Sequence, residues 1–150
     1  MRNTITVGFI QDEPNKIFSV DFTHYYMYEK IDVKYFYQTI HTEEFTQDGE
    51  NAIKTAVSGD GKVIAIYISS PLTPALFSFN SWYKYGIRIF QYDSTLGYHT
   101  QIQFIPHRYS CTQYAGLSLN EDGTVFAIQH NLNVISVQSI FKRNSTSNLF

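Results

Sequence analysis

The order of apolar and polar residues along the chain predicts short β-strands. Ile5, Val7 and Phe9 alternate with polar or small residues, and the same alternation returns at intervals throughout the sequence. A period of two places every second side chain on one face of a sheet, which is typical of a half-buried strand. The sequence predicts eleven strands, at residues 4–9, 16–22, 31–37, 42–45, 53–57, 62–68, 86–92, 100–105, 115–119, 124–128 and 133–138.

Two hairpin turns occur at equivalent places between such runs. Asp60-Gly61 and Asp122-Gly123 are each followed by a similar strand, residues 62–66 (KVIAI) and 124–128 (TVFAI). Glycine accepts the positive φ that a primed or bulged hairpin turn requires. In the first unit Pro14-Asn15 replaces Asp-Gly, so its turn matches more loosely. The sequence therefore predicts three repeats of antiparallel strands, at about residues 4–46, 52–106 and 114–140, the last without a clear fourth strand.

The predicted fold class is all-β, with antiparallel sheets in three propeller-blade-like repeats. A compact β-sandwich or barrel with hairpins that resemble one another by chance is the alternative. We predict one domain over residues 1–142, followed by a polar C-terminal tail over residues 143–150.

The repeats also resemble a known family. Residues 56–66 with 85–92, and again residues 116–128, are similar to the blade signature of FG-GAP-like β-propeller repeats, most strongly over residues 50–138. The calcium-binding loops of that family, which carry several aspartates at alternate positions, have no counterpart here. Calcium binding is therefore not expected. Such repeats usually serve as interaction platforms, so the resemblance implies binding rather than chemistry.

Composition and charge narrow the class of protein. The 150 residues are 43% hydrophobic and 17% aromatic, and only 16% are charged, which excludes an intrinsically disordered chain. A formal net charge of -2 gives no support to nucleic-acid binding. The single cysteine, Cys111, excludes an internal disulfide framework, and we find neither a signal peptide nor an apolar run long enough to span a membrane. An intracellular location, or one within an assembled particle, is favoured.

Few residues indicate catalysis. The five histidines, His24, His41, His99, His107 and His130, form no zinc-ligand pattern. His107 and Cys111 have the types of a nucleophilic pair, but nothing marks the thiol as activated, and a polar loop with a buried thiol explains them equally well. The adjacent carboxylates Asp12-Glu13 and Glu43-Glu44 fit solvated turn or strand positions. We therefore expect no catalytic residue, no cofactor, no metal and no enzyme activity.

Aromatic residues are concentrated in two segments, 24–28 and 71–85, which are predicted to connect the second and third strands of the first two repeats. Equivalent connections emerge on the same rim of the array, where recognition residues are common. The candidate interaction residues are Tyr25, Tyr26, Tyr28, Phe77, Phe79, Trp82 and Tyr83. Folding of these side chains back onto the core is the alternative.

Three repeats are too few to close a propeller, which typically has four to eight blades. The unclosed sheets would leave edges that favour pairing with another chain. We therefore expect a non-enzymatic structural or interaction subunit that assembles with a protein partner or with itself. The alternative is a module that binds a carbohydrate or peptide on the aromatic rim; an enzyme ranks third.

Overall fold

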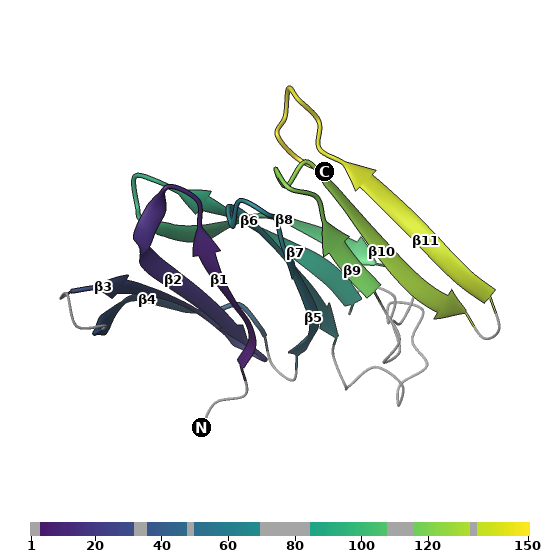
Figure 1. The fold of residues 1–150 in the computed structure, drawn as a ribbon. Coiled ribbons are helices and arrows are strands. Elements are labelled where there is room, and N and C mark those ends of the chain that lie inside the picture. Colours follow the sequence, from purple (N-terminus) through teal and green to yellow (C-terminus); the bar gives the residue numbers. More distant parts are fainter. Residues whose placement is uncertain (1–3, 32–35, 48–49, 70–84, 108–115, 133–134) are drawn as a thin grey trace.

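The chain forms three antiparallel β-sheets that follow one another in sequence (Figure 1). The computed structural model describes residues 4–31, 36–47, 50–69, 85–107, 116–132 and 135–150. We call the sheets blades 1, 2 and 3. Blade 1 contains β1 (Thr4–Ile10), β2 (Glu13–Asp21), β3 (His24–Lys30) and β4 (Tyr37–Glu44). Blade 2 contains β5 (Asn51–Val57), β6 (Val63–Ser69), β7 (Tyr85–Asp93) and β8 (Tyr98–His107), and blade 3 contains β9 (Gly116–Leu119), β10 (Val125–Leu132) and β11 (Ile135–Lys142).

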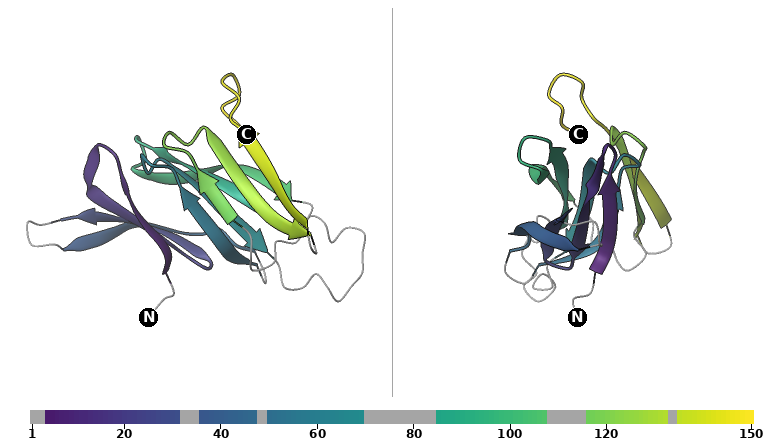
Figure 2. Two further views of the ribbon diagram at one scale, coloured as in Figure 1. Left: turned by 45° about the vertical axis from the view of Figure 1, so that its right-hand side comes forward. Right: turned by 60° about the vertical axis from the view of Figure 1, so that its left-hand side comes forward.

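Each blade is a simple meander in which consecutive strands pair antiparallel. The blades fan out side by side, with β5 in contact with β1 on one side and with β9 on the other (Figure 2). The predicted all-β class with antiparallel, blade-like repeats is therefore confirmed, and a sandwich or barrel is not needed to describe it.

One predicted strand assignment is wrong. Residues 24–28, expected to connect two strands, belong to β3 itself, and the predicted strand at 31–37 falls mainly between β3 and β4, with residues 32–35 outside the described part. The reason lies in the side chains of β3. Tyr25 and Met27 enter the core while Tyr26 and Tyr28 lie on the opposite face, so a strand with aromatic residues on both faces shows no polar alternation.

Blade 2 is buried on both of its faces, and β6 shows this best. Ile64, Ile66 and Ile68 pack toward blade 1, in a core with Phe18, Val20, Tyr25 and Met27. The alternate residues Val63, Ala65 and Tyr67 pack toward blade 3, in a second core with Phe126 and Ile128. Full burial of each large apolar side chain contributes about 2 kcal/mol, so these two cores hold the three blades together.

The first hairpin turns of blades 2 and 3 have the same hydrogen bonds. In each, the first residue of the turn (Ser58 in blade 2, Asn120 in blade 3) accepts a bond, through its side-chain oxygen, from the amide five residues later. The aspartate in third place (Asp60 or Asp122) accepts a bond from the amide two residues after it. The glycine in fourth place has a φ of 74° in blade 2 and 70° in blade 3. The residues are Ser58, Asp60 and Gly61 in blade 2, and Asn120, Asp122 and Gly123 in blade 3.

These turns also join neighbouring blades. The amide of Gln11 in blade 1 donates to the carbonyl of Asp60 in blade 2, at 2.9 Å, and the amide of Asp60 donates to the carbonyl of Glu121 in blade 3, at 3.0 Å. The first turns of all three blades therefore form one hydrogen-bonded rim, which we call the turn rim. Each bond satisfies a backbone amide and a carbonyl, and together the bonds fix how far each blade is offset from the next.

A second type of turn also recurs on this rim. Asp93 accepts bonds from the amides of Thr95 and Leu96 before β8, and Asn144 accepts bonds from the amides two and three residues later. The turn at Asp93 ends with Gly97, which has a φ of 83°, and the turn at Asn144 ends with Asn148, which has a φ of 61°. His99 and Phe150 each follow two residues later, and both are directed into the core that faces the preceding blade. The division into a 1–142 domain and a 143–150 tail stays a prediction.

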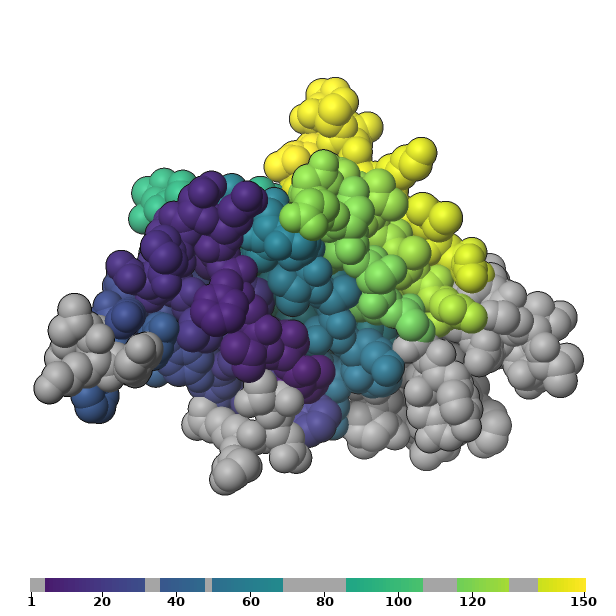
Figure 3. Space-filling model, in the orientation of Figure 1, coloured from purple at the N-terminus to yellow at the C-terminus, as the bar shows by residue number. Residues whose placement is uncertain are grey.

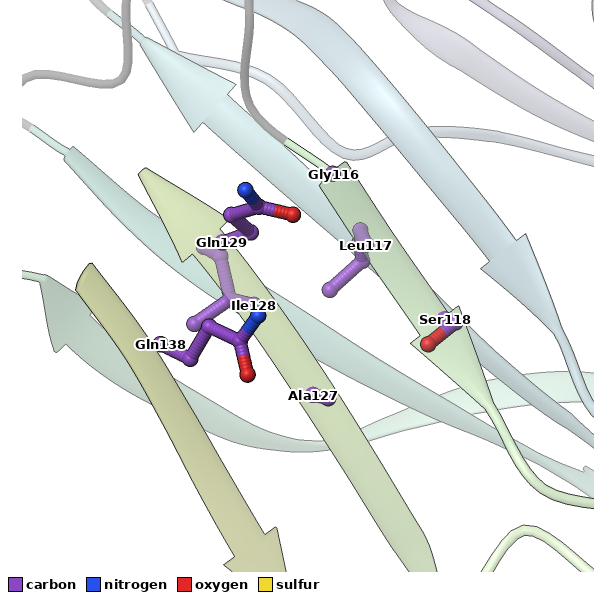
Figure 4. Close-up of a pocket in the computed structure, with 7 residues that line it drawn as sticks. All are labelled: Gly116, Leu117, Ser118, Ala127, Ile128, Gln129 and Gln138. Carbon is purple, nitrogen blue, oxygen red and sulfur yellow. The ribbon is translucent and has the colours of Figure 1, made fainter. Parts of the chain in front are cut away.

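The outward faces of blades 1 and 3 are more open than the faces of blade 2. On blade 1, Val7 and Phe9 of β1 are 56% and 64% exposed, and the N-terminal strands form the purple surface in Figure 3. On blade 3, a shallow hollow crosses β9, β10 and β11 on the side away from blade 2 (Figure 4). It is lined by Gly116, Leu117, Ser118, Ala127, Ile128, Gln129 and Gln138.

The close approach of the first turn of blade 2 to β1 makes Gly61 intolerant of a side chain. At Gly61 a Cβ atom would lie 1.8 Å from the carbonyl oxygen of Phe9, and its φ of 74° is unfavourable for other residues. We expect Gly61→Ala to lower the free energy of unfolding by at least about 2 kcal/mol, measured by urea denaturation. Gly116→Ala is the matched control, because there the nearest atom is 3.7 Å away and no positive φ is required. Equal losses in both variants would contradict this account of the rim.

Candidate functional site

The structure separates the aromatic residues that the sequence groups together. Tyr25 is completely buried between blades 1 and 2, whereas Tyr26 and Tyr28 stack on each other, with ring centroids 6.1 Å apart, on the other face of β3. The candidates Phe77, Phe79, Trp82 and Tyr83 lie outside the described residues, as does Cys111. A role of these aromatic residues in binding a partner stays a prediction.

A small polar pocket lies at the turn rim where blades 1 and 2 meet. It has a volume of about 210 Å³ and is lined by Gln11, Asp12, Glu13, Lys62, Tyr92 and Ser94. The lining comes from the first turn of blade 1, the first turn of blade 2 and the end of β7. We call it the rim pocket. It places two carboxylates, one ammonium group and a phenol around a space that suits a small polar molecule.

A directed chain of hydrogen bonds fixes two residues of the pocket lining, Glu13 and Tyr92. The ammonium of Lys16 donates to the hydroxyl of Tyr92 at 3.1 Å and to the carbonyl oxygen of Gly97 at 3.3 Å. The hydroxyl of Tyr92 in turn donates to Oε1 of Glu13 at 3.2 Å. Because Tyr92 is only 9% exposed, this chain holds the Glu13 carboxylate in a fixed position at the edge of the pocket.

The groups bonded in this chain affect one another's ionisation. Burial alone would lower the pKa of Lys16, but its hydrogen bond to Tyr92 and the nearby carboxylates of Glu13 and Glu29 raise that pKa above its ordinary value. Burial also raises the pKa of Tyr92, although the bond from Lys16 opposes the rise. Lys16 therefore stays an ammonium and Tyr92 a neutral phenol at ordinary pH.

Backbone bonds also hold Lys62 in place. The amide of Lys62 donates to Oδ1 of Asp60 at 2.9 Å, and its carbonyl oxygen accepts a bond from the amide of Tyr92 at 2.8 Å. The turn of blade 2 and the end of β7 are thereby joined at this residue. The positions of Tyr92 and Lys62 in the pocket lining consequently depend on how β7 and this turn are packed together.

Beneath the rim pocket lies a buried histidine. His99 has no exposed surface; its backbone amide donates to the hydroxyl of Tyr25 at 3.0 Å, and its Nδ1 lies 2.7 Å from the same hydroxyl. Its Nε2 lies 2.8 Å from the carbonyl oxygen of Gly61. A carbonyl only accepts, so Nε2 carries the proton and Nδ1 accepts the proton of Tyr25.

The electrostatics of this network favour neutral groups. Burial lowers the pKa of His99 to about 4, although its bond to Gly61 and the charge of Asp60 act in the opposite direction. Burial likewise raises the pKa of Tyr25. His99 is thus an uncharged imidazole at neutral pH, with a hydrogen-bond partner for each of its ring nitrogens.

Two other concavities among the described residues offer less chemistry. The hollow on blade 3 is lined by small, apolar and amide side chains without a titratable group. A concavity of about 350 Å³ beside Tyr92 and Thr100 contains Asp93, which is already occupied as the cap of its own turn. In the part of the chain that the structure describes, no three His, Cys, Asp or Glu side chains are grouped as a metal site would require, and no helix has the length and hydrophobicity of a membrane crossing.

The sequence analysis missed the rim pocket. It interpreted Glu13 as a solvated turn residue and gave no role to Lys16 or Tyr92. Glu13 and Tyr92 are 79 residues apart, and their contact depends on the packing of two blades. No local pattern in the sequence reports such a contact. The positive-φ turns of the rim are the one feature that could have indicated where the pocket lies.

Comparison with known proteins identifies the type of fold. No protein-family model matches the sequence, and neither does any curated protein sequence. A protein from Lactobacillus plantarum is similar in structure, with a TM-score of 0.63 at 10% identity over 97% of this chain. A candidate 6-phosphogluconolactonase from Bacteroides uniformis ATCC 8492 has a TM-score of 0.63 at 16% identity over 99% of this chain. An oligogalacturonate lyase from Vibrio parahaemolyticus, at 12% identity over 91% of this chain, has a TM-score of 0.46, too low to support an argument.

This chain spans 39% of the length of each of these neighbours. At such identities the neighbours show the fold of the chain and not its activity. They nevertheless contradict two predictions. We expected a non-enzymatic structural subunit and no enzyme activity, yet a counterpart over nearly the whole chain is named as an enzyme. The first expectation rested on three blades being too few to close a ring, and the second on the absence of catalytic motifs within short stretches of sequence, which says little about sites assembled between blades. What the fold establishes is that the chain carries three blades of the β-propeller type.

Proposed function

We propose that this chain contributes to a β-propeller enzyme that hydrolyses a small anionic sugar lactone in the rim pocket. The observation that carries the proposal is the Glu13 carboxylate, held by Tyr92 at the edge of a pocket that also presents Lys62. The name of the Bacteroides uniformis counterpart suggests the substrate class, a phosphorylated sugar acid lactone. We also propose that the blades are FG-GAP-like, on the strength of their matching Asp-Gly turns.

The residues of the pocket suit this reaction. Glu13 accepts a proton from a water molecule while the water oxygen attacks the lactone carbonyl. The bond between the carbonyl carbon and the ring oxygen then breaks, and Glu13 returns the proton to the departing oxygen. One water is consumed and one hydroxy acid is formed. The ammonium group of Lys62 stabilises the negative charge of the substrate and of the carbonyl oxygen during attack.

Removal of the carboxylate is the most direct test of catalysis. The 150-residue chain should accelerate the hydrolysis of 6-phosphogluconolactone, followed by acid release at constant pH and corrected for the spontaneous reaction. We expect Glu13→Gln to lower kcat by about 100-fold or more, because the amide cannot accept a proton. Glu44→Gln, at an exposed position on β4, is the matched control and should leave the rate unchanged. Acceleration that is equal in both variants, or absent in the unaltered chain, would overturn the proposal.

Charge at the pocket should govern affinity for the anionic product. We expect Lys62→Met to weaken the binding of 6-phosphogluconate, measured by calorimetry, by about fivefold or more at low salt, with a smaller effect at high salt. Lys54→Met removes the same charge from an exposed position on β5 that does not line the pocket, and it should change the affinity little. Equal weakening by both substitutions would mean that the ligand responds only to overall charge.

A further inference from the structure

His99 lies where it can control the geometry of the rim pocket. Its ring packs edge-on against the ring of Tyr92, with centroids 5.5 Å apart, and its Nε2 holds the carbonyl of Gly61 at 2.8 Å. Tyr92 lines the pocket, and Gly61 is joined directly to Lys62, which also lines it. One buried side chain therefore contacts both Tyr92 and the residue that precedes Lys62.

The same side chain also joins the two blades. Tyr25, which bonds both the backbone amide and Nδ1 of His99, comes from β3 of blade 1, whereas His99 and Gly61 belong to blade 2. The ring of Phe18 packs against His99 from β2, at a centroid distance of 4.7 Å. A change at His99 is thus transmitted to the interface beneath the pocket.

The direction of the hydrogen bonds makes this arrangement specific for neutral imidazole. The Tyr25 oxygen already accepts the backbone amide of His99 and donates its single proton to Nδ1. A protonated Nδ1 needs an acceptor, so the Tyr25 hydroxyl would have to rotate and leave its own proton without a partner in a buried site. An unsatisfied buried donor and an uncompensated charge both disfavour the observed packing of His99 against Tyr25, Tyr92 and Gly61, which we call the closed state of the pocket.

The charged and titratable groups around His99 do not compensate for this. Tyr25 faces it from β3, Tyr92 from β7, and Asp60 from the first turn of blade 2. The Asp60 carboxylate is occupied by the hydroxyl of Ser58 and the amide of Lys62. Further away, His41 and Glu43 of β4 lie near Tyr25, and Glu13 and Lys16 of β2 bond the hydroxyl of Tyr92.

We propose that His99 is a positioning residue for the rim pocket, which keeps Tyr92 and the Gly61–Lys62 peptide in place while it is neutral and releases them when it is protonated. Only the identity of the bound ligand rests on the proposed function. The geometric part concerns the pocket itself and can be tested without any ligand.

The interface between blades 2 and 3 provides a suitable control side chain. Phe150 lies two residues after Asn148, as His99 lies two residues after Gly97. The ring of Phe150 packs edge-on against the ring of Phe126, with centroids 4.9 Å apart. An aromatic ring without a titratable group therefore fits the equivalent position. His99→Phe keeps the packing but removes both the bond to Gly61 and the response to acid.

Hydrogen exchange of the unliganded 150-residue chain tests the proposal. The amides of Gly61, Lys62 and Tyr92, which donate to Ser58, Asp60 and Lys62, report whether the pocket is closed. The pKa of His99 is about 4 in the closed state and ordinarily 6.5, so the closed pocket is most stable above pH 6.5 and loses stability as pH falls toward 4. We expect the opening equilibrium at these amides to rise roughly 40-fold between pH 6.5 and pH 4.5, after correction for intrinsic exchange.

The variants separate this role from a general contribution to stability. In His99→Phe the three amides should exchange faster at pH 6.5 and show little added pH dependence. Ile66→Val, a substitution in the same core away from the pocket, should keep the steep pH dependence. If His99→Phe does not fold, Tyr25→Phe serves instead: it removes the bond that favours neutral imidazole, so the pKa of His99 in the closed state should rise toward 6.5 and the increase in opening between pH 6.5 and pH 4.5 should be smaller than in the unaltered chain. Opening that is unchanged while His99 titrates, or that occurs only with global unfolding, would overturn the proposal.

A binding experiment distinguishes the two proposals. If 6-phosphogluconate binds, its affinity for the unaltered chain should fall between pH 6.5 and pH 4.5 by a larger factor than for His99→Phe. An equal fall in both proteins would overturn the positioning role even though the lactone site stands. Absence of binding at every pH, together with acid-dependent exchange at the three amides, would overturn the proposed function and support the positioning role.

Discussion

The burial of blade 2 on both faces is the constraint on which the rest of the structure depends. A four-stranded sheet with one solvent-exposed face needs apolar side chains only at every second position of its strands. In β6, by contrast, almost every residue from Val63 to Ile68 is apolar. Such a strand is stable only between two other sheets. The blades on either side then bring their first turns together, and the hydrogen bonds from Gln11 to Asp60 and from Asp60 to Glu121 follow from that packing.

The two blade interfaces differ in their chemistry although their geometry repeats. Between blades 2 and 3, the residue that follows the turn at Asn144 and enters the interface is Phe150, which lies in an apolar core. Between blades 1 and 2, the residue that follows the turn at Asp93 is His99, with Tyr25 and Gly61 as partners. Polar groups in a core contribute little net stability compared with well-packed apolar residues, and they are costly when a partner is lost. The polar interface is also the one that lies beneath the rim pocket, so the position of the polar network agrees with a role in the site rather than in packing.

The sequence predicts most of the fold because the relevant information is local. Alternating residues and the turns at Asp60-Gly61 and Asp122-Gly123 determine strands and hairpins over ten or so neighbouring positions. Segment 24–28 was misassigned because both faces of β3 are covered, so that aromatic residues occupy consecutive positions and the period is hidden. The site could not be predicted in the same way. Lys16 and Tyr92 are 76 residues apart, and each is unremarkable within its own strand.

The chemistry of the site therefore follows from how two repeats differ, not from a motif that either one contains. The first turn of blade 1 has Asp12 with a φ of 70° where blades 2 and 3 have glycine, and Glu13 begins β2 at once. This shorter turn brings a carboxylate to the rim beside blade 2, whose own turn presents Lys62. If neighbouring blades carried identical turns, the same residues would lie at every interface, and a carboxylate would meet an ammonium group only by chance. Variation between repeats is thus the physical means by which an array of similar sheets acquires one site of distinct chemistry.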